Sequence, residues 1–161
     1  GLAVTMANRV IFSKNATTVL WSDGTKTTVK AYGEDIDHEK GLAMAVAKRV
    51  FMDADGHWKN KFNKVLESAE HDELMRVSGD VVANLKNIYN DYYEKHVTKY
   101  SDDFDVDAQK KLCNDALKAA IRNRKKYIPT NTGLKSSDIE AEVQNRMEAY
   151  SAYFITQHPI E

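Results

Sequence analysis

Three short runs decide the fold: Asn8-Arg-Val-Ile-Phe-Ser13, Thr17-Thr-Val-Leu-Trp-Ser-Asp23-Gly24-Thr-Lys-Thr-Thr-Val-Lys30, and Glu39-Lys-Gly-Leu-Ala-Met-Ala-Val-Ala-Lys48. In the first two runs apolar and polar residues alternate, which is the period of a strand with one buried face. Asp23-Gly24 supplies the positive φ angles that a tight hairpin turn needs. The sequence therefore predicts strands over 8–13, 17–22 and 26–31 in a three-stranded antiparallel meander.

A helix over 38–52 is expected to cover this sheet, because a small meander is only marginally stable alone. Leu42, Val46 and Val50 form its predicted apolar stripe, and alanines beside the stripe favour a close approach to the sheet. Gly41 lies inside this helix, where glycine costs about 1 kcal/mol relative to alanine. It indicates a close backbone contact or a helix that begins later.

The rest of the chain has helical spacing. A short stripe over 58–66 is followed by a long one that predicts a helix over 72–100. The next helix begins near a cap at Asp105 or Ser101, and Ile128–Gly133 forms a loop. Ser137-Asp-Ile-Glu140 has the form of a capping box and opens the last helix. The expected fold class is α+β, with a meander-plus-helix module over 6–52 followed by a mainly α-helical bundle over 53–161.

The composition and charge of the chain argue against several classes of function. The 161 residues are 42% hydrophobic and 29% charged, as in a globular protein, and the net charge of −1 argues against both bulk DNA binding and imitation of DNA. No run is long and apolar enough for a membrane span, no signal peptide is recognisable, and the single Cys113 suits a reducing cytoplasm. Met6 is expected to be the natural first residue, with residues 1–5 contributed by an expression vector.

The residues that could bind a metal or act in catalysis are better explained by structural roles. None of the five histidines pairs with another His or Cys at metal-ligand spacing, and the aspartates over 102–107 fit helix capping better than a calcium loop. Cys113 lies in an apolar helical stripe, where core packing is favoured over nucleophilic catalysis. No nucleophile elbow or phosphate-binding glycine loop occurs. We therefore expect no enzyme activity, no metal and no cofactor.

Three surfaces are candidates for partner binding. Basic residues on one face of the third helix form a ridge that fits a phosphate backbone or simply a solvated face: Lys111, Lys118, Arg122 and Lys125. The hairpin offers a rigid exposed tip, with Trp21, Asp23, Gly24, Lys26 and Lys30 as candidate contacts. Tyrosines suggest an interface, or alternatively internal packing: Tyr89, Tyr93, Tyr100 and Tyr153.

A further cluster combines basic and aromatic residues. Lys59, Lys61 and Lys64 lie beside Trp58 and Phe62, a mixture that can stack nucleic-acid bases. The same two rings at a spacing of four residues also fit a position in a core.

The hairpin and the following helix resemble a family of small proteins from phages and prophages of Gram-positive bacteria. The residues that carry the resemblance are Trp21-Ser-Asp-Gly-Thr-Lys-Thr-Thr-Val-Lys30 and Glu39-Lys-Gly-Leu-Ala-Met-Ala-Val-Ala-Lys48, about the first third of the chain. Some type II anti-CRISPR proteins are similar small hairpin-plus-helix phage products. The resemblance implies an inhibitor that binds a host RNA-guided nuclease, through its protein or its guide RNA.

Two other functions remain open from the sequence. One is a phage nucleic-acid-binding accessory protein, for which the basic ridge would be the contact surface. The other is a structural or assembly protein that forms a homo-oligomer through its tyrosines.

Overall fold

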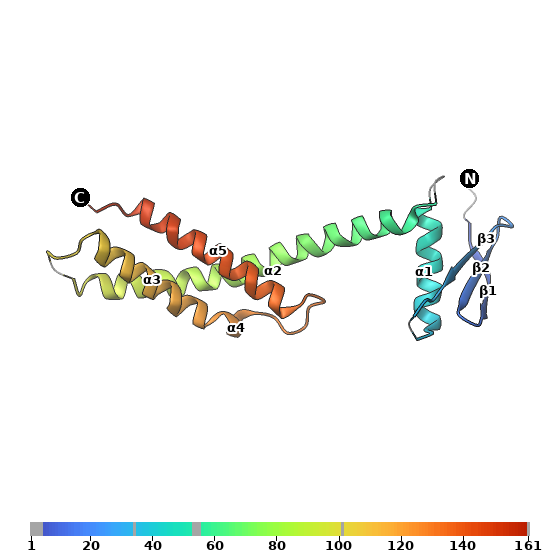
Figure 1. Ribbon diagram of the computed structural model, residues 1–161, viewed down its shortest axis with the longest axis horizontal. Helices are drawn as coiled ribbons and strands as arrows, with labels where there is room; N and C mark the ends of the chain where they lie inside the picture. The colour runs from blue at the N-terminus through green and yellow to red at the C-terminus, as the bar shows by residue number, and fades with distance from the viewer. Residues whose placement is uncertain (1–4, 34, 53–55, 101, 161) are drawn as a thin grey trace. The chain divides into compact units, whose positions relative to one another are not determined.

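The computed structural model describes residues 5–33, 35–52, 56–100 and 102–160 (Figure 1). Three strands, β1 (Ala7–Ser13), β2 (Ala16–Trp21) and β3 (Lys26–Lys30), are followed by α1 (His38–Phe51), α2 (Trp58–Val97), α3 (Val106–Arg122), α4 (Arg124–Tyr127) and α5 (Ser136–Gln157). This confirms the predicted α+β class. The chain divides into two compact units, Gly1–Ser68 and Ala69–Glu161, which we call the N-terminal unit and the helical unit.

The sheet of the N-terminal unit is the predicted antiparallel meander, with strand order β1-β2-β3. Val19 lies opposite Val10 on β1 and Thr27 on β3. A bulge between Ala7 and Arg9 shifts the register where β1 begins. The predicted strand limits agree with the structure to within one residue at each end.

Helix α1 covers one face of the sheet through its small residues (Figure 1). Ala45 is fully buried, and Val19 and Trp21 complete this small core. A Cβ atom on Gly41 would lie 2.3 Å from the hydroxyl oxygen of Thr17, so the close backbone contact expected at Gly41 is confirmed.

The predicted stripe of α1 was wrong in part. Val46 and Val50 are exposed, and only Leu42 packs against the core of the N-terminal unit. The face toward the sheet instead runs through Gly41 and Ala45, whose small size lets the helix approach closely. One turn further on, Arg49 reaches over the Trp21 ring.

Helix α2 is longer than predicted, since it runs without a break from Trp58 to Val97. The polar stretch around His71, which lies between the two predicted stripes, is exposed but helical. Helix-favouring residues and the Glu73–Arg76 ion pair sustain it. The division between the two units falls inside α2, after Ser68, whereas the sequence placed a boundary near residue 52.

The helical unit has one core built from α2, α3 and α5. Its fully buried side chains include Leu85 and Tyr89 of α2, Cys113 of α3, and Ile139 and Met147 of α5. Leu85, Cys113, Ile139 and Met147 belong to the stripes that the sequence predicts, whereas Tyr89 lies outside its predicted stripe and is nevertheless fully buried. Figure 1 shows α3 and α5 running along the C-terminal half of α2.

Helix caps confirm one prediction and correct another. The Asp105 carboxylate accepts a hydrogen bond from the backbone N–H of Ala108, at 2.8 Å, and caps α3 as expected. The capping box at Ser137 does not form, because α5 begins one residue earlier and Lys135 precedes it with no side-chain cap. Glu140 instead lies 3.7 Å from Arg124.

Candidate functional site

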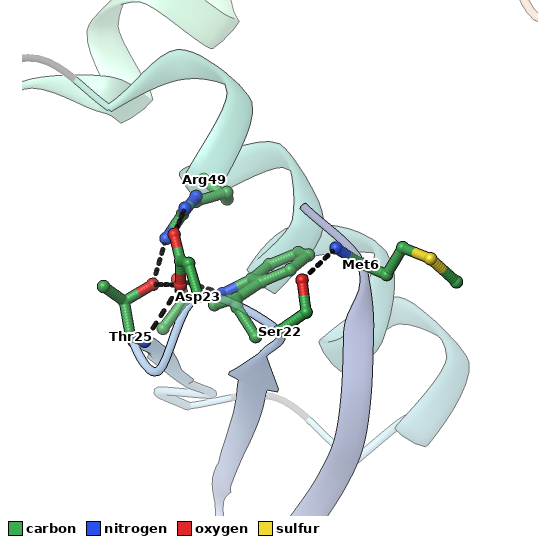
Figure 2. Close-up of polar contacts among 7 residues, drawn as sticks. Met6, Ser22, Asp23, Thr25 and Arg49 are labelled. Atoms are coloured by element: carbon green, nitrogen blue, oxygen red, sulfur yellow. Dashed lines mark hydrogen bonds and ion pairs between the residues drawn. The ribbon is translucent and has the colours of Figure 1, made fainter. Parts of the chain in front are cut away.

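The hairpin tip is fastened to the end of α1 by a polar cluster. One Asp23 carboxylate oxygen accepts hydrogen bonds from the Thr25 backbone N–H at 2.9 Å and from the Thr25 hydroxyl at 2.5 Å. The other oxygen lies 2.5 Å from Arg49, whose guanidinium also donates to the Thr25 hydroxyl. Figure 2 shows these three side chains converging between the turn and α1.

The start of β1 is tied to the same turn. The Met6 backbone N–H donates to the Ser22 hydroxyl at 2.9 Å, and the Ser22 N–H donates to the Met6 carbonyl at 2.7 Å (Figure 2). Gly24 adopts a φ angle of +86°, which a glycine accepts without strain. The Asp-Gly turn is therefore braced from both sides.

Trp21 belongs to the core of the N-terminal unit, not to its surface. The side chain is only 8% exposed, its indole N–H donates to the Thr27 hydroxyl at 2.9 Å, and Arg49 lies over its ring at 5.2 Å. Of the predicted hairpin contacts, Asp23, Gly24, Lys26 and Lys30 are exposed. Trp21 and Asp23 hold the hairpin in place.

Asp23 has a strongly lowered pKa, about 2 instead of 3.8. The hydrogen bonds from the Thr25 hydroxyl and backbone contribute most, followed by the contact with Arg49. All of them favour the charged carboxylate.

Acidification is expected to weaken the bracing of the hairpin. Because the folded pKa lies below the unfolded value, the stabilisation is complete above about pH 4 and is lost as the pH falls through 2. An NMR titration of the Asp23 carboxyl carbon should have a midpoint near 2. Thr25→Val should raise this midpoint more than Arg49→Gln does. A wild-type midpoint near 3.8 would show that the cluster is absent in solution.

At the other end of the N-terminal unit, the structure has a hollow of about 490 Å³. Its walls come from the β1–β2 turn, the end of β3, the segment that leads into α1 and the start of α2. Aromatic and basic side chains dominate the rim: Phe12, Tyr32, His38, Trp58, Lys14, Lys30, Lys40 and Lys59. We call this feature the aromatic hollow.

Sequence reasoning found only part of the aromatic hollow. It singled out Lys30 and the basic-aromatic cluster that contains Trp58 and Lys59, but did not bring them together. The missed signal is the segment between β3 and α1, where Tyr32 and Ile36 are large apolar residues outside any helix or strand. Both are exposed and line the hollow.

The predicted basic ridge is not confined to one helix, because α3 ends at Arg122 and Lys125 belongs to the short helix α4. All four of its cations, Lys111, Lys118, Arg122 and Lys125, are exposed. Asp115 and Asp107 lie on the same face of α3, at helical spacing from these cations. They reduce the positive potential that a phosphate backbone would meet.

Some of the tyrosines that were predicted to form an interface lie in the core, and others lie at the surface. Tyr89 and Tyr93 are buried in the helical core, so their predicted place in an interface is wrong and the alternative of internal packing holds. The Tyr89 hydroxyl lies 2.9 Å from the Ser151 hydroxyl, and its ring meets Phe154 edge-on. Tyr100 is partly exposed and Tyr153 is 62% exposed.

Two ionisable groups of the helical core are held in their neutral forms. Burial raises the pKa of the Cys113 thiol, and burial together with the neighbouring thiol raises the pKa of Tyr89. A thiol needs its thiolate form to attack a substrate. The core-packing interpretation of Cys113 is therefore the one that its environment favours.

Cys113 is expected to react with a chromogenic disulfide reagent far more slowly in the native protein than in urea. Its reaction rate should rise in parallel with unfolding, because the thiol becomes accessible only then. Stopped-flow absorbance at increasing urea concentrations measures this. Rapid native labelling would contradict a buried, neutral thiol.

Among the residues that the structure describes, no group of three or more His, Cys, Asp or Glu side chains is arranged to hold a metal ion. Within those same residues, no helix combines the length and apolar character that crossing a membrane requires.

Comparison of the chain with protein-family models, with curated proteins and with solved structures finds no match.

Proposed function

We propose that this chain is a non-enzymatic protein of a phage or other mobile element that inhibits a host defence nuclease in the bacterial cytoplasm. The proposed target is a type II CRISPR RNA-guided effector, bound through its protein, its guide RNA or both. The resemblance of the N-terminal unit to small phage proteins motivates this proposal. No cofactor is needed for an inhibitor that acts by occupying a surface.

One observation carries the proposal: the two runs that make up the resemblance fold into a single braced module. Asp23 of the first run pairs with Arg49, which directly follows the second run, and the Lys48 ammonium of the second run donates to the Thr28 carbonyl of the first at 2.9 Å. The shared residues thus specify a rigid scaffold. Surfaces elsewhere on the scaffold remain to contact a partner, as in many recognition modules that carry binding groups on a rigid frame.

The charge of the chain limits how it would inhibit. A net charge of −1 does not reproduce the dense negative charge of a DNA duplex. Lys26 and Lys30 are exposed on the sheet, and Lys14 and Lys59 are exposed at the aromatic hollow. We therefore expect docking onto anionic parts of the nuclease complex.

The test is a cleavage assay with purified type II effectors loaded with guide RNA. Preincubation with excess protein should block cleavage of a matched plasmid, while the same amount of heat-unfolded protein should not. The bound protein should co-elute with the effector in gel filtration. Equal cleavage rates with and without the folded protein, across effectors from Gram-positive hosts, would refute the proposal.

A second candidate function is a phage nucleic-acid accessory protein. The exposure of all four cations of the basic ridge favours it, although Asp107 and Asp115 oppose it. It predicts that Lys118→Glu weakens binding to random duplex DNA, and that wild-type binding falls steeply with salt. Absence of duplex binding at low salt would eliminate it.

A further inference from the structure

We propose that the aromatic hollow binds a short single-stranded RNA segment, with bases stacked on its rings and phosphates held by its lysines. The choice of RNA rests on the proposed function, since an RNA-guided nuclease carries exposed single-stranded RNA. The proposal deepens that function by naming the part of the partner that this unit would recognise.

The rings of the hollow are available for stacking. Tyr32 is 77% exposed and Phe12 is 42% exposed, although both are large apolar side chains. Phe12 already stacks on His38, with ring centroids 4.0 Å apart and planes 13° from parallel. This pair forms a flat surface at the rim, of the kind on which an unpaired base can stack.

The charges of the hollow favour an anion. Lys14, Lys30 and Lys59 are exposed in its lining, and Lys40 lies at the start of α1 beside it. Two carboxylates, Asp35 and Asp37, also line the hollow. Asp37 is engaged as the N-cap of α1, where it accepts the Lys40 backbone N–H at 3.1 Å. Among the described residues of the lining, cations thus outnumber carboxylates.

The combination of exposed rings and lysines selects among anionic partners. A duplex keeps its bases stacked inside and offers only phosphates to a hollow of about 490 Å³. A single strand presents both base faces and phosphates, which match the two kinds of side chain gathered here. An acidic peptide would match the lysines but would not need several flat rings. The observations therefore favour single-stranded RNA over a protein segment.

The scaffold of the hollow is rigid on the strand side. Two hydrogen bonds between Asn15 and Ala31 hold the start of β2 to the end of β3. The side-chain amide of Asn15 donates to the Ala31 carbonyl at 3.0 Å, and the Ala31 backbone N–H donates to the Asn15 backbone carbonyl at 2.8 Å. Gly41 lies on the wall formed by α1, against Thr17. Phe12 and Lys30 are therefore presented from a pre-organised frame, which lowers the entropy cost of binding.

The test measures fluorescence anisotropy of a labelled 12-nucleotide single-stranded RNA with the full chain. We expect saturable binding that weakens with salt, and weaker binding of an RNA duplex. Tyr32→Ala should lower affinity about five- to hundredfold, the range that loss of one stacked base implies. Lys30→Ala should lower affinity and also reduce the salt dependence.

Matched controls come from the helical unit. Tyr153→Ala removes a tyrosine that is 62% exposed, and Lys95→Ala removes an exposed lysine of α2 that belongs to none of the candidate binding surfaces. Both variants should bind the RNA like the wild type. Equal losses in Tyr32→Ala and Tyr153→Ala, or no RNA binding at low salt, would overturn the proposal. Equal affinity for single-stranded DNA of the same sequence would overturn the choice of RNA.

The cleavage assay separates this proposal from the proposed function. RNA binding at the hollow without inhibition of any effector would leave the site standing and refute the function. Inhibition that persists in Tyr32→Ala, with no RNA binding by the wild type, would leave the function standing and refute the site. Inhibition lost in Tyr32→Ala without any RNA binding would reject RNA in favour of a protein segment.

Discussion

Leu85→Ala is expected to lower the free energy of unfolding of the helical unit by about 2–5 kcal/mol. Leu85 is fully buried in the core that α2, α3 and α5 share, so its removal leaves a cavity lined by well-packed neighbours. Urea denaturation followed by circular dichroism measures the loss. Amide hydrogen exchange should rise across α3 and α5, because their protection depends on this core.

A matched control lies on the same helix. Leu66 of α2 is 44% exposed, so Leu66→Ala makes the same chemical change in the same helix without opening a core. Its effect should stay within about 0.5 kcal/mol. Similar losses in both variants would mean that Leu85 is not enclosed as the structure has it.

Gly41→Ala is expected to destabilise the N-terminal unit, although alanine is the better helix former. Helix propensity alone would stabilise α1 by about 1 kcal/mol. The new Cβ atom, however, would lie 2.3 Å from the Thr17 hydroxyl oxygen, and overpacking of this kind costs about 1–3 kcal/mol. Thermal unfolding of the sheet, followed by the NMR signals of β2, decides which effect is larger.

A second substitution tests the cause. Thr17→Ala removes the hydroxyl, so the double variant should recover much of the stability that Gly41→Ala loses, in a double-mutant cycle. Gly79→Ala in α2 is the matched control, since its Cβ atom would meet only the flexible end of Arg146, at 3.3 Å. It should be neutral or stabilising. A Gly41→Ala variant as stable as Gly79→Ala would show that α1 does not approach the sheet closely.

Sequence patterns predicted most of the fold, because strands, turns and helix caps depend on interactions between residues that are close in the sequence. Strand alternation around Val19 and the Asp23-Gly24 turn act over a few residues, and so does the cap at Asp105. The limits of α2 were missed because exposed polar residues around His71 interrupt its apolar stripe without interrupting its backbone. Which face of α1 meets the sheet depends on small residues, Gly41 and Ala45, that a hydrophobic pattern does not register.

The candidate site was less predictable, since it depends on which residues the fold brings together. Trp21 sits in a motif that suggested a contact surface, yet the hydrogen bond to Thr27 and its burial make it part of the scaffold. Asp23 is exposed, but its carboxylate is engaged by Arg49 from another element. The aromatic hollow joins Phe12, Tyr32 and Trp58 from three separate segments, a combination that no single stretch of sequence contains.

We propose that this protein acts by occupying a partner and that it catalyses no reaction. The most direct test is a titration of a fixed, known amount of guide-loaded type II effector with increasing protein, well above the dissociation constant. The account predicts that nuclease activity falls linearly and reaches its minimum at a fixed molar ratio near equivalence, and that activity returns when the complex is dissociated. Complete, irreversible loss of activity at a small fraction of one equivalent would reveal a catalyst and contradict the account.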